Sequence, residues 1–145
     1  MAASRSGIRR YVLDANALIG FFDGRRPAAE RVRKILSEAN RNQVSVWMSA
    51  INWGEVYYTE WRHYGEVKAQ EAEMNLRRLP VVVVEADRDR ATRAAALKQR
   101  HNLGYADAFA AELAIDRKAW LVTADPEFGR LGKVLSVFPL PRFEK

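Results

Sequence analysis

The chain has 145 residues, 48% of them hydrophobic, which is enough apolar material for one domain with one core over residues 1–145. It has no cysteine, which excludes disulfides and thiolate metal sites, so that a bound metal would need oxygen or histidine ligands. The 24 Lys and Arg residues outnumber the 18 Asp and Glu residues, and the formal charge of +6 favours a polyanionic partner such as nucleic acid.

The N-terminal half alternates between short apolar runs and segments with apolar residues at helical spacing. The run 10–13 predicts a strand that ends at Asp14, and Pro27 suits the first turn of a helix. Ser49 is a good N-cap, and Gly65 separates two helical segments. In chain order we expect a strand at 10–13, a helix after it, a helix from 27, a strand at 44–48, a helix after 49 and a helix over 66–78.

The C-terminal half continues the same alternation. Four consecutive valines at 81–84 are typical of a strand that is buried on both faces. Asp87 can cap a helix that ends near Asn102, and Gly104 opens a turn before a second helix over about 106–118. Strands are then expected at 120–122 and, more weakly, at 134–138.

Strands that alternate with helices and read as continuous apolar runs predict an α/β fold. We expect a central parallel sheet of four to five strands with helices on both faces. In such sheets ligands bind beyond the carboxyl ends of the strands. Asp14 ends the first strand, Asp125 follows the fourth, and Glu55 lies about two turns into the helix that leaves the second. The pattern therefore directs acidic side chains towards one edge.

Each acidic residue also has an ordinary structural explanation. Asp107 and Asp125 stand where helices begin, and aspartate is among the commonest N-caps. Asp14 or Asn16 could cap the helix after the first strand, and Glu55 could lie on an exposed helix face. Residue by residue, capping and catalysis both stay open.

Four segments together resemble the PIN domain family, and most closely the VapC-type toxins of bacterial toxin–antitoxin pairs. The segments extend over almost the whole chain and are Tyr11-Val12-Leu13-Asp14-Ala15-Asn16-Ala17-Leu18-Ile19, Asn52-Trp53-Gly54-Glu55-Val56, Tyr105-Ala106-Asp107-Ala108-Phe109-Ala110-Ala111 and Leu121-Val122-Thr123-Ala124-Asp125. The resemblance implies a PIN-like fold and an endoribonuclease activity. Its acidic quartet corresponds to Asp14, Glu55, Asp107 and Asp125, and its supporting polar positions correspond to Asn16 and Thr123.

Carboxylates are suitable ligands for Mg²⁺ or Mn²⁺, and four of them suit one or two ions. A bound ion can lower the pKa of a water nucleophile, and a second ion can stabilise the leaving oxygen of a phosphodiester. With the resemblance as a guide, we predict that Asp14 and Asp107 are the principal metal ligands. Asp125 would bind a second ion or support the first from the outer shell, and Glu55 would be a ligand or orient the attacking water.

The toxin resemblance further implies a small antitoxin partner and a homodimer. Arg9, Arg10, Arg25 and Arg26 flank the strand and helix that present Asp14, and we expect them to hold the RNA backbone. The first ten residues lack an apolar run of secretory length, and no stretch is apolar enough to span a membrane. We therefore expect a soluble, cytoplasmic protein.

Two other interpretations stay open. A phosphatase of the haloacid-dehalogenase type also begins with an acid after the first strand, but it would need a second Asp where this chain has Asn16. The second interpretation is a non-catalytic module that keeps the fold and binds RNA or a protein. The complete acidic quartet argues against it.

Overall fold

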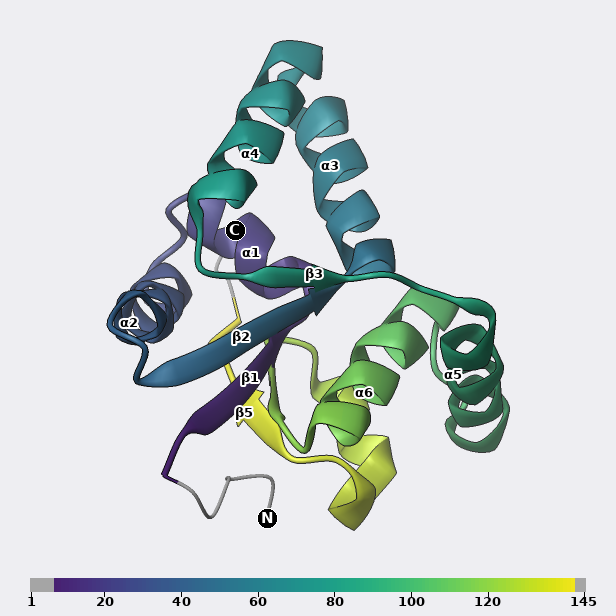
Figure 1. Cartoon of the computed structure of the whole chain (residues 1–145). Coiled ribbons are helices and arrows are strands. Elements are labelled where there is room, and N and C mark those ends of the chain that lie inside the picture. Colours follow the sequence, from purple (N-terminus) through teal and green to yellow (C-terminus); the bar gives the residue numbers. More distant parts are fainter. Residues whose placement is uncertain (1–6, 143–145) are drawn as a thin grey trace.

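A five-stranded parallel sheet forms the centre of the computed structural model, which describes residues 7–142 (Figure 1). The strand order is β3-β2-β1-β4-β5, and every neighbouring pair is parallel. The predicted parallel α/β architecture is therefore confirmed. The strands are β1 (Arg9–Leu13), β2 (Val44–Ser49), β3 (Val82–Val84), β4 (Trp120–Thr123) and β5 (Val137–Pro139).

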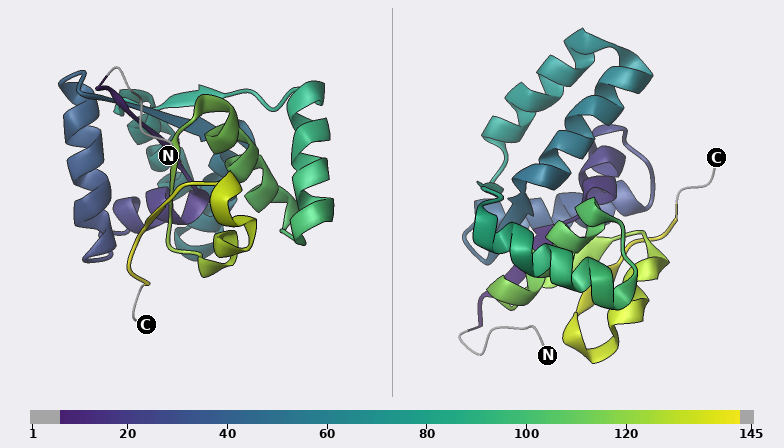
Figure 2. Two further views of the ribbon diagram at one scale, coloured as in Figure 1. Left: turned by 90° about the horizontal axis from the view of Figure 1, so that it is seen from below. Right: turned by 90° about the vertical axis from the view of Figure 1, so that its right-hand side faces the viewer.

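Helices cover both faces of the sheet, as expected, and Figure 2 shows α2 and α5 on opposite sides. Neighbouring residues of β1 contribute to two separate apolar cores, one on each face of the sheet. Leu13 packs in one core with Leu18 and Val32. Val12 packs in the other with Phe109 and Leu121. The helices are α1 (Ala15–Phe22), α2 (Ala28–Asn40), α3 (Ala50–Tyr64), α4 (Glu66–Arg78), α5 (Arg88–His101), α6 (Tyr105–Arg117) and the 3-10 helix η1 (Pro126–Val134).

The predicted caps explain where several helices begin. The side chains of Asp14, Ser49 and Asp87 each accept a hydrogen bond from a backbone N–H of the first turn that follows. Gly65 ends α3 with a φ of 93°, a left-handed conformation in which a side chain would be strained. Because α4 begins directly after this glycine, α3 and α4 form a hairpin that projects away from the sheet (Figures 1 and 2).

Two expectations about the strands were wrong in detail. The valines of β3 are not buried on both faces, because β3 is the edge strand and has only β2 beside it; Val82 is 58% exposed. The last strand begins at Val137, later than expected, because Pro126 and the residues up to Val134 form η1 instead.

The sheet topology brings the carboxyl ends of β1, β2 and β4 to one edge, because these neighbouring strands are parallel. Asp14, the helix that carries Glu55, and Asp125 all follow those ends. Over residues 7–142, the helices are too short or too polar to cross a membrane.

Candidate active site

Asp14 lies at the centre of this edge, directly after β1, and is 3% exposed. Its backbone N–H donates to the carbonyl of Val122 at 3.1 Å, which extends the β1–β4 pairing beyond the last residue of β1. Oδ1 accepts the N–H of Ala15 at 2.9 Å, so that Asp14 also caps α1. Both its backbone and one carboxylate oxygen are thus held in place by the fold.

Asn16 and Thr123 hold the second oxygen of Asp14. The hydroxyl of Thr123 donates to Oδ2 at 2.8 Å, and Nδ2 of Asn16 donates to the same oxygen at 3.0 Å. Asn16 also donates to the Thr123 hydroxyl at 3.1 Å and accepts the N–H of Ala124 at 3.0 Å. The network ties β1 and α1 to the loop after β4 and places both side chains against Asp14; that they support a metal ligand stays a prediction.

Burial raises the pKa of Asp14, the hydrogen bonds from Thr123 and Ala15 lower it, and the charges of Asp107 and Glu55 raise it, with a net result of about 7. The fold therefore keeps a desolvated carboxylate beside other acids. A nearby cation would favour its charged form.

Asp107 stands in the first turn of α6 and is partly buried. The N-cap of α6 is Gly104, and no side chain there accepts a capping hydrogen bond, so capping does not explain Asp107. Burial, and after it the charges of Asp125, Glu55 and Glu127, together raise its pKa to about 6. A Cβ at position 104 would lie 3.2 Å from Oδ2 of Asp107, so the glycine leaves room for this carboxylate.

Glu55 is partly buried on α3 and accepts a hydrogen bond at Oε1 from Nδ2 of Asn52, at 2.9 Å. The same amide donates to the carbonyl of Ala106 at 3.1 Å, one residue before Asp107. Asn52 thus joins the helix of Glu55 to the helix of Asp107. It is fully buried, and its Oδ1 has no hydrogen-bond partner among the described residues.

Asp125 follows β4 and caps η1, with Oδ1 accepting the N–H of Glu127 at 2.9 Å. The capping interpretation is therefore correct for Asp125. The cap also brings an unforeseen acid into the site, because one oxygen each of Asp107, Asp125 and Glu127 lie within 4.8 Å of one another.

Asn52 and Glu127 were not among the site residues predicted from the sequence. Asn52 stands one helical turn before Glu55, and the i, i+3 spacing that places them on one face is visible in the sequence. Glu127 is two residues after Asp125, and a capped turn at Asp125-Pro126 would bring its backbone close to the capping carboxylate. The direction in which the Glu127 side chain points could not be predicted from the sequence.

The donor set fits a divalent cation of the magnesium class. Asp107, Asp125 and Glu127 supply carboxylate oxygens, which hard cations prefer. The charge of Glu55 raises the pKa of both Asp14 and Asp107, and the charge of Asp107 raises that of Asp14, so these acids lie close to one another as well. Two unit charges about 4.8 Å apart repel by roughly 3 kcal/mol at an effective dielectric of about 20, an upper guide because water screens them. A bound cation would remove this repulsion.

The four arginines predicted to hold RNA lie some way from the acids. Arg9 and Arg10 begin β1, so that Arg10 is about 13 Å along the strand from Asp14. Arg10 donates to the carbonyl of Arg117 at 3.2 Å. Arg25 and Arg26 follow the opposite end of α1, where they pair with Asp23 at 3.4 Å and Glu30 at 3.3 Å. RNA that contacted these arginines would have to extend well beyond the acidic edge.

Solved structures with this fold are numerous. VapBC2 from Rickettsia felis, bound to a promoter DNA fragment, has a TM-score of 0.72 at 17% identity and covers 90% of this chain and 98% of its own. A toxin–antitoxin complex from Klebsiella pneumoniae has a TM-score of 0.70 at 24% identity, over 91% and 99%. VapC20 of Mycobacterium tuberculosis, described as a toxin that cleaves the sarcin-ricin loop, has a TM-score of 0.68 at 17% identity, over 84% and 95%.

These identities establish the fold alone, and no curated protein sequence matches the chain. The family model of the PIN domain, however, matches residues 11–134, which include all the helices, strands β2, β3 and β4, most of β1 and every acid of the candidate site. The chain therefore belongs to the PIN domain family.

Proposed function

We propose that this chain is a metal-dependent endoribonuclease and the toxin of a toxin–antitoxin pair. The observation that supports this most strongly is the cluster of carboxylates at the carboxyl edge of the sheet, in which Asp107, Asp125 and Glu127 could hold a metal ion. Membership of the PIN domain family and the likeness of the fold to solved toxins support the same proposal.

The residues have distinct roles in this proposal. Asp14 and Asp107 would be the principal ligands of Mg²⁺ or Mn²⁺, and Asp125 and Glu127 would bind the same ion or a second one. The bound ion supplies Lewis-acid chemistry, which activates water and stabilises the charge that develops on the phosphodiester. Asn16 and Thr123 donate hydrogen bonds to Oδ2 of Asp14 and so hold its carboxylate in one orientation.

Glu55 is the best-placed residue to orient the attacking water or accept its proton. It is partly buried, and only one of its carboxylate oxygens is held by Asn52 at 2.9 Å, so the other oxygen can contact a water. The arrangement of Asn16 disfavours the phosphatase alternative. Its amide is fully engaged with Asp14, Thr123 and Ala124, and an amide cannot serve as the second acid of that mechanism.

The proposal includes a small antitoxin that covers the acidic edge, since solved structures of the same fold are toxin–antitoxin complexes. It also includes a homodimer of this chain, for which the support is the resemblance to the toxin family. An antitoxin cation placed among these carboxylates would compete with the metal. Expression of this chain alone should arrest bacterial growth, and the Asp107→Asn variant should not. Normal growth at high soluble expression would count against the toxin assignment.

The direct experiment is an end-mapped cleavage assay on total RNA with the purified chain, with chelator and with millimolar Mg²⁺ or Mn²⁺. We expect cleavage that requires metal and is lost by at least a hundredfold in Asp107→Asn, the scale of loss typical for removal of key charge stabilisation. Asp87→Asn is the matched control, because Asp87 caps α5, is not one of the acids of the candidate site, and Asn caps equally well. RNA binding without cleavage at any metal concentration would support the non-catalytic alternative instead.

A further inference from the structure

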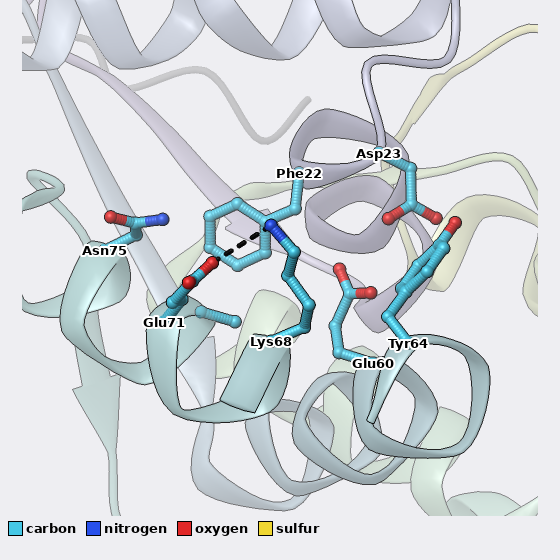
Figure 3. A pocket seen from close by; sticks show the side chains of 8 residues that line it. Phe22, Asp23, Glu60, Tyr64, Lys68, Glu71 and Asn75 are labelled. Carbon is cyan, nitrogen blue, oxygen red and sulfur yellow. Dashed lines mark ion pairs between the residues drawn. The ribbon is translucent and has the colours of Figure 1, made fainter. Parts of the chain in front are cut away.

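A second acidic cavity lies between the C-terminal end of α1 and the α3–α4 hairpin, outside the candidate active site (Figure 3). Its volume is about 340 Å³. Phe22 and Asp23 line it from the end of α1, and Glu60, Tyr64, Lys68 and Glu71 line it from the hairpin. In Figure 3 the carboxyl groups of Asp23 and Glu60 and the hydroxyl of Tyr64 point into the same space.

Two of these carboxyl groups are buried beside each other. Glu60 is 4% exposed, and the side chain of Asp23 is 8% exposed. Burial and the neighbouring charge of Asp23 together raise the pKa of Glu60 to about 7, although the charge of Arg25 acts in the opposite direction. Near neutral pH a bound cation would therefore favour the charged form of Glu60.

Cations around the cavity are already paired with the other acids. Nη2 of Arg25 is 3.4 Å from Asp23, and Nζ of Lys68 is 3.2 Å from Glu71 on the rim. Within residues 7–142, Glu60 takes part in none of the ion pairs, although it is the most buried acid of the cavity. Buried carboxylates are normally paired, and the Arg25 cation whose charge acts on Glu60 already forms an ion pair with Asp23, so Glu60 can accept a further cation.

We infer that this cavity binds the guanidinium group of an arginine side chain on a protein partner, with Asp23 and Glu60 as its acceptors. A guanidinium is planar and donates several N–H groups in a fork, which matches two adjacent carboxylates. Its faces pack favourably on aromatic rings, and Phe22 and Tyr64 provide them here. A metal ion suits this cavity less well than the acidic cluster of Asp107, Asp125 and Glu127, because the apolar Phe22 and Ala72 form part of the lining.

The rim of the cavity indicates a protein rather than a free arginine derivative. Tyr64, which lines the cavity, is 54% exposed. Val67 does not line the cavity itself, but it stands one helical turn before the lining residue Glu71 on α4 and is 68% exposed. A peptide that inserts an arginine could cover these apolar groups with neighbouring side chains, whereas a small cation could not. The inference concerns a binding site apart from the carboxylates proposed for RNA cleavage, so either proposal can fail without the other.

The test is an NMR titration of backbone amides, with chelator present, using three blocked probes. These are acetyl-arginine amide, its neutral analogue acetyl-citrulline amide, and acetyl-Leu-Arg-Leu-amide. We expect saturable shifts at Asp23, Glu60, Tyr64 and Lys68 with both arginine probes and none with citrulline. The tripeptide should bind about tenfold more tightly than the single residue, through the apolar rim.

Glu60→Gln should abolish these shifts and leave RNA cleavage unchanged, and it should fold because it removes a buried charge. Glu71→Gln, on the rim, is the matched control and should bind within twofold of the wild type. Binding should strengthen from pH 6 to pH 8 as Glu60 loses its proton to solvent, because its pKa is raised to about 7; the other charged groups that face it are Asp23, Arg25, Lys68 and Glu71.

Several results would overturn the inference. One is the absence of saturable shifts up to about 20 mM probe, which corresponds to negligible affinity. Equal shifts with citrulline, or unchanged binding in Glu60→Gln, would remove the carboxylates as acceptors. Equal affinity for the tripeptide and the single arginine would exclude the protein partner, and shifts confined to the residues around Asp107 would place the cation at the other acidic site.

Discussion

Replacing Asn52 by Leu should separate catalysis from stability. The variant keeps the approximate size of the buried side chain but loses the hydrogen bonds to Oε1 of Glu55, at 2.9 Å, and to the carbonyl of Ala106, at 3.1 Å. The bond to the charged Glu55 contributes about 1.5 to 3 kcal/mol, and the bond to the neutral carbonyl about 1 kcal/mol. The substitution also removes the unpartnered Oδ1, which costs the wild type about 1 to 3 kcal/mol.

These contributions largely cancel, so we expect Asn52→Leu to lose about 1 kcal/mol of stability, or a few degrees in Tm. Catalysis has no such compensation, because Glu55 would no longer be tied to the helix of Asp107. Partners that orient the residues of a metal site typically change activity by about 10 to 100-fold. We therefore expect a loss of that size in the single-turnover rate at saturating RNA, with little change in RNA affinity.

The assay is single-turnover cleavage of a mapped RNA site, with thermal melts of the same samples. Asn40→Leu, the same exchange on the exposed end of α2, is the control and should cleave at the wild-type rate. Wild-type cleavage by a folded Asn52→Leu would refute the positioning role. An equal fall in stability and activity, through loss of folded protein, would refute it as well.

Three further predictions test the charges and the space at the two acidic sites. Without metal, Asp107→Asn should melt at or above the wild-type temperature, because it relieves repulsion, and added Mg²⁺ or Mn²⁺ should stabilise it less; an unchanged metal response in melts would contradict the metal site. Gly104→Ala should reduce the cleavage rate about tenfold, because the added Cβ would displace Oδ2 of Asp107. Gly129→Ala is the control, since a Cβ there meets nothing within 4 Å, and equal cleavage rates for the two variants would refute the steric argument. The pKa of Glu60 is raised to about 7, so in the folded protein Glu60 keeps its proton at pH values where the unfolded chain has lost it. Its contribution to stability therefore falls as pH rises from about 4.5 to about 7, and the Tm of Glu60→Gln should rise relative to that of the wild type over this range. A Tm difference between the two proteins that stays constant over this range would refute the prediction.

Apolar periodicity and capping residues predicted most of the fold, because the signals are local. Asp14, Ser49 and Asp87 cap helices where they were expected to, and the alternation of strands and helices fixed the parallel sheet. The exposure of Val82 could not be predicted in the same way. Whether an apolar strand lies at the centre or the edge of a sheet depends on strand order, which is decided by contacts between distant segments.

The residues of the candidate site also fall into those that could be predicted from local signals and those that could not. The acids that follow strands could be placed from the topology rule, since parallel strands carry their carboxyl ends to one edge. Asn52 and Glu127 were missed because their contributions depend on side-chain direction: Asn52 reaches across to Ala106, and Glu127 turns back towards Asp107. Side-chain directions of this kind require the packed structure.

Capping and metal binding were treated as alternatives for each aspartate, and the structure shows why they need not be. A carboxylate has two oxygens with about four lone pairs, and a backbone N–H occupies only one of them. Oδ1 of Asp125 accepts the N–H of Glu127, while an oxygen of Asp125 lies within 4.8 Å of ligand oxygens on Asp107 and Glu127. The cap orients the carboxylate and restricts its rotamers, which lowers the entropy that a bound ion would have to overcome. An aspartate at a helix start after a parallel strand is therefore favoured for both roles by the same geometry.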